Sequence, residues 1–129
     1  MKTPEDKLAD MLTDERLTRI DVVLNARLSG LTVLLEDLHK PQNMGACIRT
    51  LEAIGIQNVH IIEGEEPFVP NPKITQGCHK WVDVHPHANP EAAVEALRAQ
   101  GYRILVTSPD ATHSLDQLSF ESPACLCFG

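Results

Sequence analysis

The residues of this chain best suited to chemistry lie between Leu34 and Thr50, where Asn43, Gly45 and Arg49 follow a proline. An arginine side chain held in a fixed place can bind an anion through paired hydrogen bonds or stabilise developing negative charge. Gly45 and Arg49 are four residues apart, which places them on one face of a helix. The spacing predicts a guanidinium beside a bare patch of backbone that a ligand or another strand can approach. A cap, a glycine and a solvated arginine on an ordinary amphipathic helix explain the same residues without any chemistry.

Apolar spacing predicts the helix that positions these residues. One core-facing stripe recurs three and four residues apart, at Met44, Cys47, Ile48, Leu51 and Ile54. Pro41 keeps the residue before it extended, so the helix cannot begin earlier, and the Asn43 side chain is placed to cap the first turn. We therefore expect a strand at 31–36, a tight loop through Pro41 and a helix that Gly55 ends.

Strand and helix patterns alternate along the rest of the chain. We expect strands at 58–62, 102–107 and 124–128, and a helix from Pro90 capped by Asn89. The segment 4–27 is expected to be helical, either throughout or with a break at Thr13 after which Asp14 caps a second helix. The segment 63–73 is rich in proline and acidic residues, which predicts a surface loop. Strand–helix–strand units of this spacing are right-handed. The predicted fold class is therefore α/β, an open parallel sheet with helices on both faces.

Nearly the whole chain resembles a known family. The segment Arg19–Gly64 is similar to the start of the SpoU-type ribose methyltransferases of the knotted SPOUT superfamily, whose first motif places an arginine six residues after an asparagine, as Asn43 and Arg49 do. TQGCHKWVDV at 75–84 resembles the segment ahead of the family's third strand. ILVTS at 104–108 resembles the strand whose threonine borders the cofactor pocket. Within the family, the similarity is greatest to the enzymes that methylate guanosine 18 of tRNA.

The resemblance implies that the methyltransferase domain is incomplete. In the family, the strand that corresponds to 124–129 leads into a second motif with an acidic residue, and a Ser-Leu-Asn motif follows later; the sequence reaches Gly129 without either. These motifs form the trefoil knot and most of the S-adenosylmethionine pocket. We expect an N-terminal helical arm at 1–28, an incomplete Rossmann-like SPOUT domain at 29–129 whose C-terminal trefoil-knot portion is missing, and a chain that is inactive alone.

The resemblance also implies an activity and roles for individual residues. The activity is methyl transfer from S-adenosylmethionine to a ribose 2′-hydroxyl of RNA, with tRNA as the substrate, by a homodimer whose active site lies near the subunit interface. Arg49 would be catalytic, either as a base or as a stabiliser of charge, and Asn43 would orient it or cap its helix. Thr107 would face the cofactor. The RNA-binding candidates are Arg16, Arg19, His39, Lys40 and Lys80, with Trp81 either a stacking surface for RNA or a core or dimer anchor.

Composition limits the other classes of protein. The net charge of −7 is unusual for an RNA-binding protein, because lysine and arginine make the phosphate contacts, but several basic residues precede Thr50. The four cysteines lack zinc-ligand spacing, and His85 and His87 have no third ligand nearby, so we expect no metal. Free thiols, no signal peptide and no long apolar run indicate a cytoplasmic protein without a membrane anchor.

Other functions remain compatible with the sequence. The chain could be a noncatalytic RNA-binding or dimerisation module. It could also be a ribosomal-RNA 2′-O-methyltransferase, although such relatives often carry an additional N-terminal RNA-binding domain, for which 1–27 is too short. An unrelated nucleotide-binding α/β domain would need a glycine-rich phosphate loop, which the sequence lacks.

Overall fold

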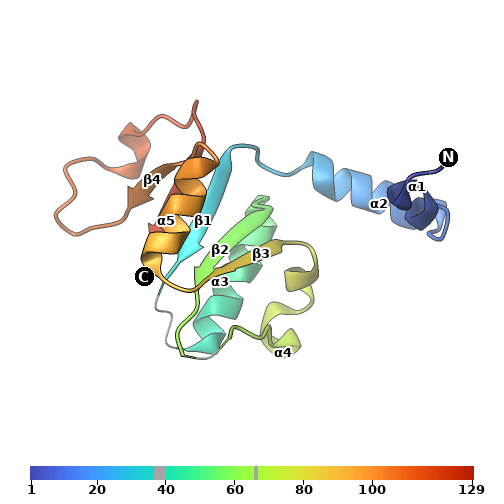
Figure 1. The fold of residues 1–129 in the computed structure, drawn as a ribbon, viewed down its shortest axis with the longest axis horizontal. Helices are drawn as coiled ribbons and strands as arrows, with labels where there is room; N and C mark the ends of the chain where they lie inside the picture. Colours follow the sequence, from blue (N-terminus) through green and yellow to red (C-terminus); the bar gives the residue numbers. More distant parts are fainter. Residues whose placement is uncertain (37–39, 66) are drawn as a thin grey trace.

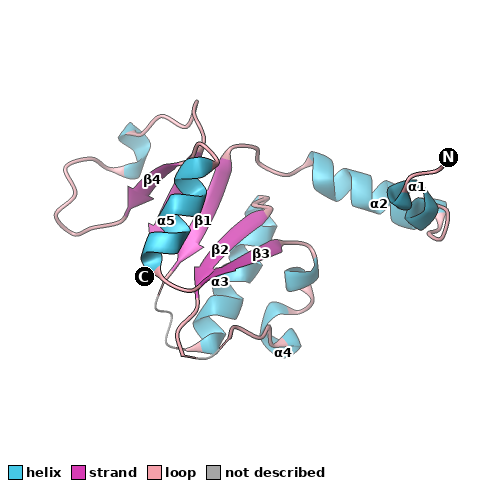
Figure 2. Ribbon diagram, in the orientation of Figure 1, coloured by secondary structure: helices cyan, strands magenta, loops and turns pink. Residues whose placement is uncertain are grey.

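Five parallel strands form a single sheet at the centre of the protein (Figures 1 and 2). The computed structural model describes residues 1–36, 40–65 and 67–129. The strands are β1 (Leu31–Leu35), β2 (Asn58–Ile62), β3 (Asp83–His87), β4 (Arg103–Val106) and β5 (Ala124–Phe128), in the order β3-β2-β1-β5-β4. The continuous apolar run of β1 lies in the middle, because a strand covered on both faces must be apolar on both.

Helices cover both faces of this sheet, as the predicted fold class requires. Helix α3 (Pro41–Ile54) packs on one face against Val33 and Leu35, and α5 (Pro90–Ala99) packs on the other against Leu34. Consecutive residues of β1 therefore serve two separate cores, since side chains alternate across a strand. The Asn89 side chain accepts a hydrogen bond from Ala92 N at 2.8 Å, which confirms Asn89 as the cap of α5.

The N-terminal residues form two short helices that extend away from the sheet (Figure 1). They are α1 (Pro4–Ala9) and α2 (Asp14–Asn25), and neither contains a buried residue. The break at Thr13 is confirmed, but Asp14 is the first residue of α2 and not its cap. The Thr13 hydroxyl accepts a hydrogen bond from Arg16 N and caps the helix instead. The helical segment predicted to continue to residue 27 ends at Asn25 instead.

The predicted loop at 63–73 is correct except at its end. Pro72 begins a short helix, α4 (Pro72–Thr75), because Asn71 caps it by accepting a hydrogen bond from Lys73 N. The described residues also form two 3₁₀ turns, η1 (Cys78–Lys80) and η2 (Leu115–Gln117). Within the residues that the structure describes, no helix is long and apolar enough to cross a membrane.

Candidate functional site

Asn43 and Arg49 both lie on α3, which begins at the edge of the sheet where the parallel strands end. In open α/β sheets, ligands bind beyond these carboxyl ends. Both side chains are exposed, and the Arg49 guanidinium has no hydrogen-bond partner among the described residues. This leaves Arg49 available to a ligand.

Asn43 does not cap α3, so that prediction is wrong. The helix begins at Pro41, its N-cap residue is Lys40, and no side chain makes the capping hydrogen bond. The proline is pre-set for the first helical position, which puts Asn43 two residues further, inside the first turn. Six residues turn an α-helix through about 240°, so Asn43 and Arg49 project from different sides of α3. A direct role for Asn43 in orienting Arg49 therefore gains no support from the geometry.

Gly45 is buried against α4 rather than open to a ligand. A Cβ at position 45 would lie 2.8 Å from Ile74 Cγ2 and 3.6 Å from Thr75 Cγ2. The bare patch of backbone that the spacing predicts is thus covered by a short helix, not by a strand or a substrate. Gly45 permits α4 and the segment after it to pack against the helix that carries Arg49.

We expect Gly45→Ala to lower the free energy of unfolding by about 1 kcal/mol, because the added methyl group overpacks the contact with Ile74. At an exposed helix position the same change would raise it by roughly 1 kcal/mol. An Ile74→Ala background removes the contact with Cγ2 and leaves only the Cβ of residue 74, at 3.3 Å, so Gly45→Ala should cost much less stability there. Urea unfolding of the two single variants and the double variant measures this coupling; equal effects of Gly45→Ala in both backgrounds would contradict it.

The segment between α4 and β3 presents Lys80. Thr75 is fully buried, and its Oγ1 lies 2.6 Å from His79 Nδ1, which fixes the turn immediately before Lys80. The turn needs left-handed backbone at Gln76 (φ 52°) and Gly77 (φ 85°). Lys80 itself is exposed at the end of η1. The Thr75–His79 pair was missed from the sequence, although a glycine between two hydrogen-bonding side chains was a signal for a fixed turn.

The remaining candidates lie at separate places. Thr107 follows β4, and its Oγ1 donates to Cys127 O at 3.3 Å, so the hydroxyl links β4 to β5. Lys40 is exposed at the start of α3, and Arg16 and Arg19 are exposed on α2, in the arm. His39 lies outside the described residues. The structure therefore places Lys40 on the same helix end as Asn43 and keeps Arg16 and Arg19 apart from Thr107 (Figure 1).

An apolar groove of about 450 Å³ runs between α3 and the β1–β5 part of the sheet. Its walls include Leu31, Leu35, Cys47, Ile54, Leu126 and Phe128. Ile54 is 55% exposed, so the last residue of the apolar stripe borders this groove instead of lying in the core. Phe128 is 42% exposed. The β1–β5 part of the sheet is therefore only partly covered on this face.

The described residues of this chain do not by themselves form a pocket that fits S-adenosylmethionine. The cofactor carries a carboxylate, an ammonium group and ribose hydroxyls, all of which need hydrogen-bond partners when they leave water. The groove beside α3 is lined almost entirely by apolar side chains, and the Thr107 hydroxyl is already engaged by Cys127 O.

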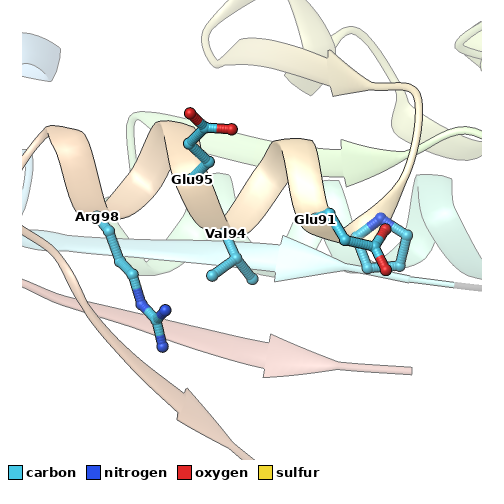
Figure 3. A pocket seen from close by; sticks show the side chains of 5 residues that line it. Glu91, Val94, Glu95 and Arg98 are labelled. Carbon is cyan, nitrogen blue, oxygen red and sulfur yellow. The ribbon is translucent and has the colours of Figure 1, made fainter.

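A second hollow, of about 550 Å³, lies along the outer surface of α5 (Figure 3). Glu91, Val94, Glu95 and Arg98 border it, and all of them come from this one helix. It is a shallow surface depression to which no other described element contributes a side chain, and nothing connects it with Arg49.

Three histidines gather on the α5 face of β2 and β3. His60 alternates with the core residues Val59 and Ile61 and is only 3% exposed. Its Nδ1 lies 2.9 Å from His87 Nε2, and its ring stacks on that of His85 with centroids 4.8 Å apart. Burial, together with the two neighbouring rings, lowers the pKa of His60 to about 4. Burial and His85 also lower the pKa of His87. In the described part of the chain, no three metal-binding side chains are arranged to hold an ion.

Comparison with known proteins assigns this chain to a family. The model of the SpoU rRNA Methylase family matches residues 30–129, and the chain belongs to this family. The resemblance seen in the sequence is thereby confirmed.

Particular relatives agree with this assignment. The tRNA (guanosine(18)-2′-O)-methyltransferase of Borreliella burgdorferi is 36% identical over 123 residues, which are 95% of this chain and 56% of that protein. The structure of the A. aeolicus TrmH/SpoU tRNA modifying enzyme superposes with a TM-score of 0.79 at 27% identity, over 88% of this chain and 59% of that chain. The SpoU methyltransferase AviRb from Streptomyces viridochromogenes, in complex with the cofactor AdoMet, shares the fold, with a TM-score of 0.64 at 24% identity. The chain thus spans little more than half the length of the first two.

Proposed function

We propose that this chain is part of an RNA 2′-O-ribose methyltransferase that uses S-adenosylmethionine and acts on guanosine 18 of tRNA. The observation that carries the proposal is the Asn43–Arg49 motif, exposed on α3 at the carboxyl edge of the sheet in a member of the SpoU family. The similar relatives that act on guanosine 18 of tRNA support the choice of substrate. An enzyme of tRNA would work in the cytoplasm.

Arg49 is proposed as the catalytic residue. A ribose 2′-hydroxyl is a poor nucleophile, so its proton must leave as the bond to the methyl carbon forms. Arginine keeps its proton in proteins, which makes a guanidinium better suited to stabilising the developing negative charge on the oxygen, or to holding the neighbouring phosphate, than to accepting a proton. The exposure of Arg49 supports this role. Asn43, exposed in the first turn of the same helix, is proposed to contact the substrate at the edge of the sheet.

The proposed RNA path combines two surfaces. Lys40 is exposed at the start of α3 and Lys80 on η1, which packs against α3, and each can hold a phosphate. Arg16 and Arg19 are exposed on the arm and can contact the RNA further from the reacting ribose. We propose that residues 1–28 act as an RNA-binding arm and residues 29–129 as the methyltransferase part.

The chain alone is expected to bind S-adenosylmethionine weakly and to transfer no methyl group, because its described residues do not form the cofactor pocket. Isothermal calorimetry tests the first statement, and a micromolar dissociation constant would contradict it. For the second, tRNA is incubated with methyl-labelled cofactor and digested, and 2′-O-methylguanosine is measured. An enzyme as long as its relatives should modify tRNA but not a tRNA with 2′-deoxyguanosine at position 18. Modification of ribosomal RNA in preference to tRNA would favour the alternative substrate.

We also propose that the enzyme is a homodimer. Support comes from apolar side chains that remain exposed, including Met11 and Val22 on the arm and Phe128 beside the groove. Exposed apolar patches commonly mark protein–protein contacts. Sedimentation equilibrium should give twice the mass of one chain, and a monomer at about 100 μM would contradict the proposal.

A noncatalytic RNA-binding or dimerisation module is the second candidate. The apolar groove favours it, because it offers a surface for a protein partner and not for the cofactor. Under this alternative, Arg49→Ala would leave tRNA affinity unchanged, and no form of the protein would methylate RNA.

A further inference from the structure

Arg27 is one of the basic residues in the N-terminal part of the sequence, yet its side chain does not face solvent. Its side chain is only 9% exposed. The guanidinium donates to Glu52 O at 2.9 Å, to Glu52 Oε1 at 3.2 Å and to Trp81 O at 3.1 Å. These contacts use the planar fork of arginine, which presents several donors in fixed directions. RNA cannot reach a guanidinium that is held in this way.

The three contacts join elements that are far apart in the sequence. Arg27 follows the end of α2, Glu52 lies in the last turn of α3, and Trp81 directly follows Lys80. One of the bonds reaches Glu52 O near the C-terminus of α3, a carbonyl that also accepts from Gly55 N. A positive charge is favourable at this end of a helix. Arg27, at the end of the arm, thus contacts both the helix that carries Arg49 and the segment that carries Lys80.

The backbone around Arg27 fits the same junction. Leu28 N donates to Gly55 O at 2.8 Å, which fastens the connection to the end of α3. Gly55 has φ 93°, and a Cβ there would lie 2.9 Å from Ala26 O. The end of the arm therefore sits directly on the residue that ends α3, and a side chain at position 55 would push it away.

Removal of Arg27 would leave polar groups without partners. Glu52 is about three-quarters buried on its side chain, and its carboxylate would lose its only ion pair among the described residues. Trp81 O would lose its donor. A buried charge without its partner is costly, so neighbouring elements would shift to let water in. Lysine keeps the charge but has a single ammonium nitrogen. One nitrogen cannot reach two carbonyls and a carboxylate as the planar guanidinium does.

We propose that Arg27 is a positioning residue that holds the arm, the Arg49 helix and the Lys80 segment in one fixed arrangement. RNA bound by Arg16 and Arg19 on the arm and by Lys80 is then presented to Arg49, which is three residues before Glu52 on α3. The presentation of RNA rests on the proposed function, whereas the junction itself does not. Arg27 acts through these elements and makes no phosphate contact of its own.

The test uses the 129-residue chain with Arg27→Lys, Arg27→Gln and Glu52→Gln. Trp81 is the only tryptophan, so its indole ¹H–¹⁵N signal reports on the junction. We expect both Arg27 variants to shift this signal, and Glu52→Gln, which keeps both carbonyl acceptors, to shift it less. Arg98→Gln, an exposed arginine on α5, should leave it unchanged. Far-UV circular dichroism shows which variants remain folded, and Glu52→Gln keeps the test decisive if an Arg27 variant does not fold.

Affinity for unmodified tRNA, measured by fluorescence anisotropy over a range of salt concentrations, separates positioning from phosphate contact. Arg27→Lys should weaken binding about tenfold although the charge is kept, since misplacement by about 1 Å is enough for such losses. Arg27→Gln should leave the slope of log affinity against log salt unchanged, whereas Arg19→Gln should reduce it by roughly 0.7–0.9, as expected for one lost phosphate contact.

Each other outcome overturns the proposal in a distinguishable way. An unchanged Trp81 signal in all three variants would show that the junction does not depend on Arg27. A shifted signal with unchanged tRNA affinity would reduce Arg27 to a structural link. A reduced salt slope in Arg27→Gln would make it a phosphate contact. If the chain without substitutions binds no tRNA while the Trp81 signal still shifts in the variants, the RNA contacts proposed for this chain fail and the junction alone stands.

Discussion

Replacement of Arg49 by alanine is expected to lower the rate of tRNA methylation at least about 100-fold, or roughly 3 kcal/mol of transition-state stabilisation. The physical reason is the loss of the positive charge that faces the developing oxyanion or the neighbouring phosphate. The measurement is the rate at which the labelled methyl group is transferred to tRNA under single-turnover conditions. It uses a form of the enzyme that has the full length of its relatives. Single turnover separates the chemical step from binding and product release.

The fold should not change in this variant. Arg49 is exposed and has no partner among the described residues, so the free energy of unfolding should move by less than about 0.5 kcal/mol. Arg98→Ala, which removes an exposed arginine from α5, is the matched control and should retain the full rate. Arg49→Lys keeps the charge but loses the paired hydrogen bonds, so an intermediate rate is expected. Turnover of Arg49→Ala close to that of the unmodified enzyme would refute the assignment.

Acid is expected to destabilise the protein through His60. The pKa of its side chain is about 4 in the folded protein and about 6.5 in the unfolded chain, so the unfolded state binds more protons between these values. The free energy of unfolding should therefore be constant above pH 6.5 and fall as the pH is lowered from 6.5 to 4. The total loss is about 3 kcal/mol, with His87 adding in the same direction.

Urea unfolding followed by Trp81 fluorescence at several pH values measures this dependence. The interval from pH 6.5 to 5 is the most informative, because most carboxylates titrate below it. His60→Phe removes the titrating group and should flatten the curve in this interval. His113→Gln, a change in an exposed loop, should leave the curve as steep as before. A flat profile in the unmodified protein would show that His60 is readily protonated in the folded state.

Much of the fold follows from local patterns in the sequence. The apolar run of β1, the stripe of α3 and the cap at Asn89 each reflect contacts within a few residues, which is why their elements were predicted within a few positions. The break at Thr13 is local too, although Thr13 caps α2 where Asp14 was expected to do so. The Asn43–Arg49 spacing pointed to the family for the same reason. Capping of α3 was predicted wrongly because Pro41 and Asn43 both favour a helix start, and the proline begins it two residues earlier.

Contacts between distant segments could not be predicted in this way. The sequence around Gly45 predicts an open patch, but α4 packs on it. Arg27 is one of several basic residues before Thr50 in the sequence, and only the fold surrounds its guanidinium with Glu52 and Trp81. His60 is an unremarkable strand residue until the register of β2 and β3 brings His85 and His87 beside it. The spacing of residues along the chain determines which side chains share one face of a helix. Burial, charge pairing and pKa values depend on contacts between segments that are 25 or more residues apart in the sequence. Only the packing of the whole sheet determines these contacts.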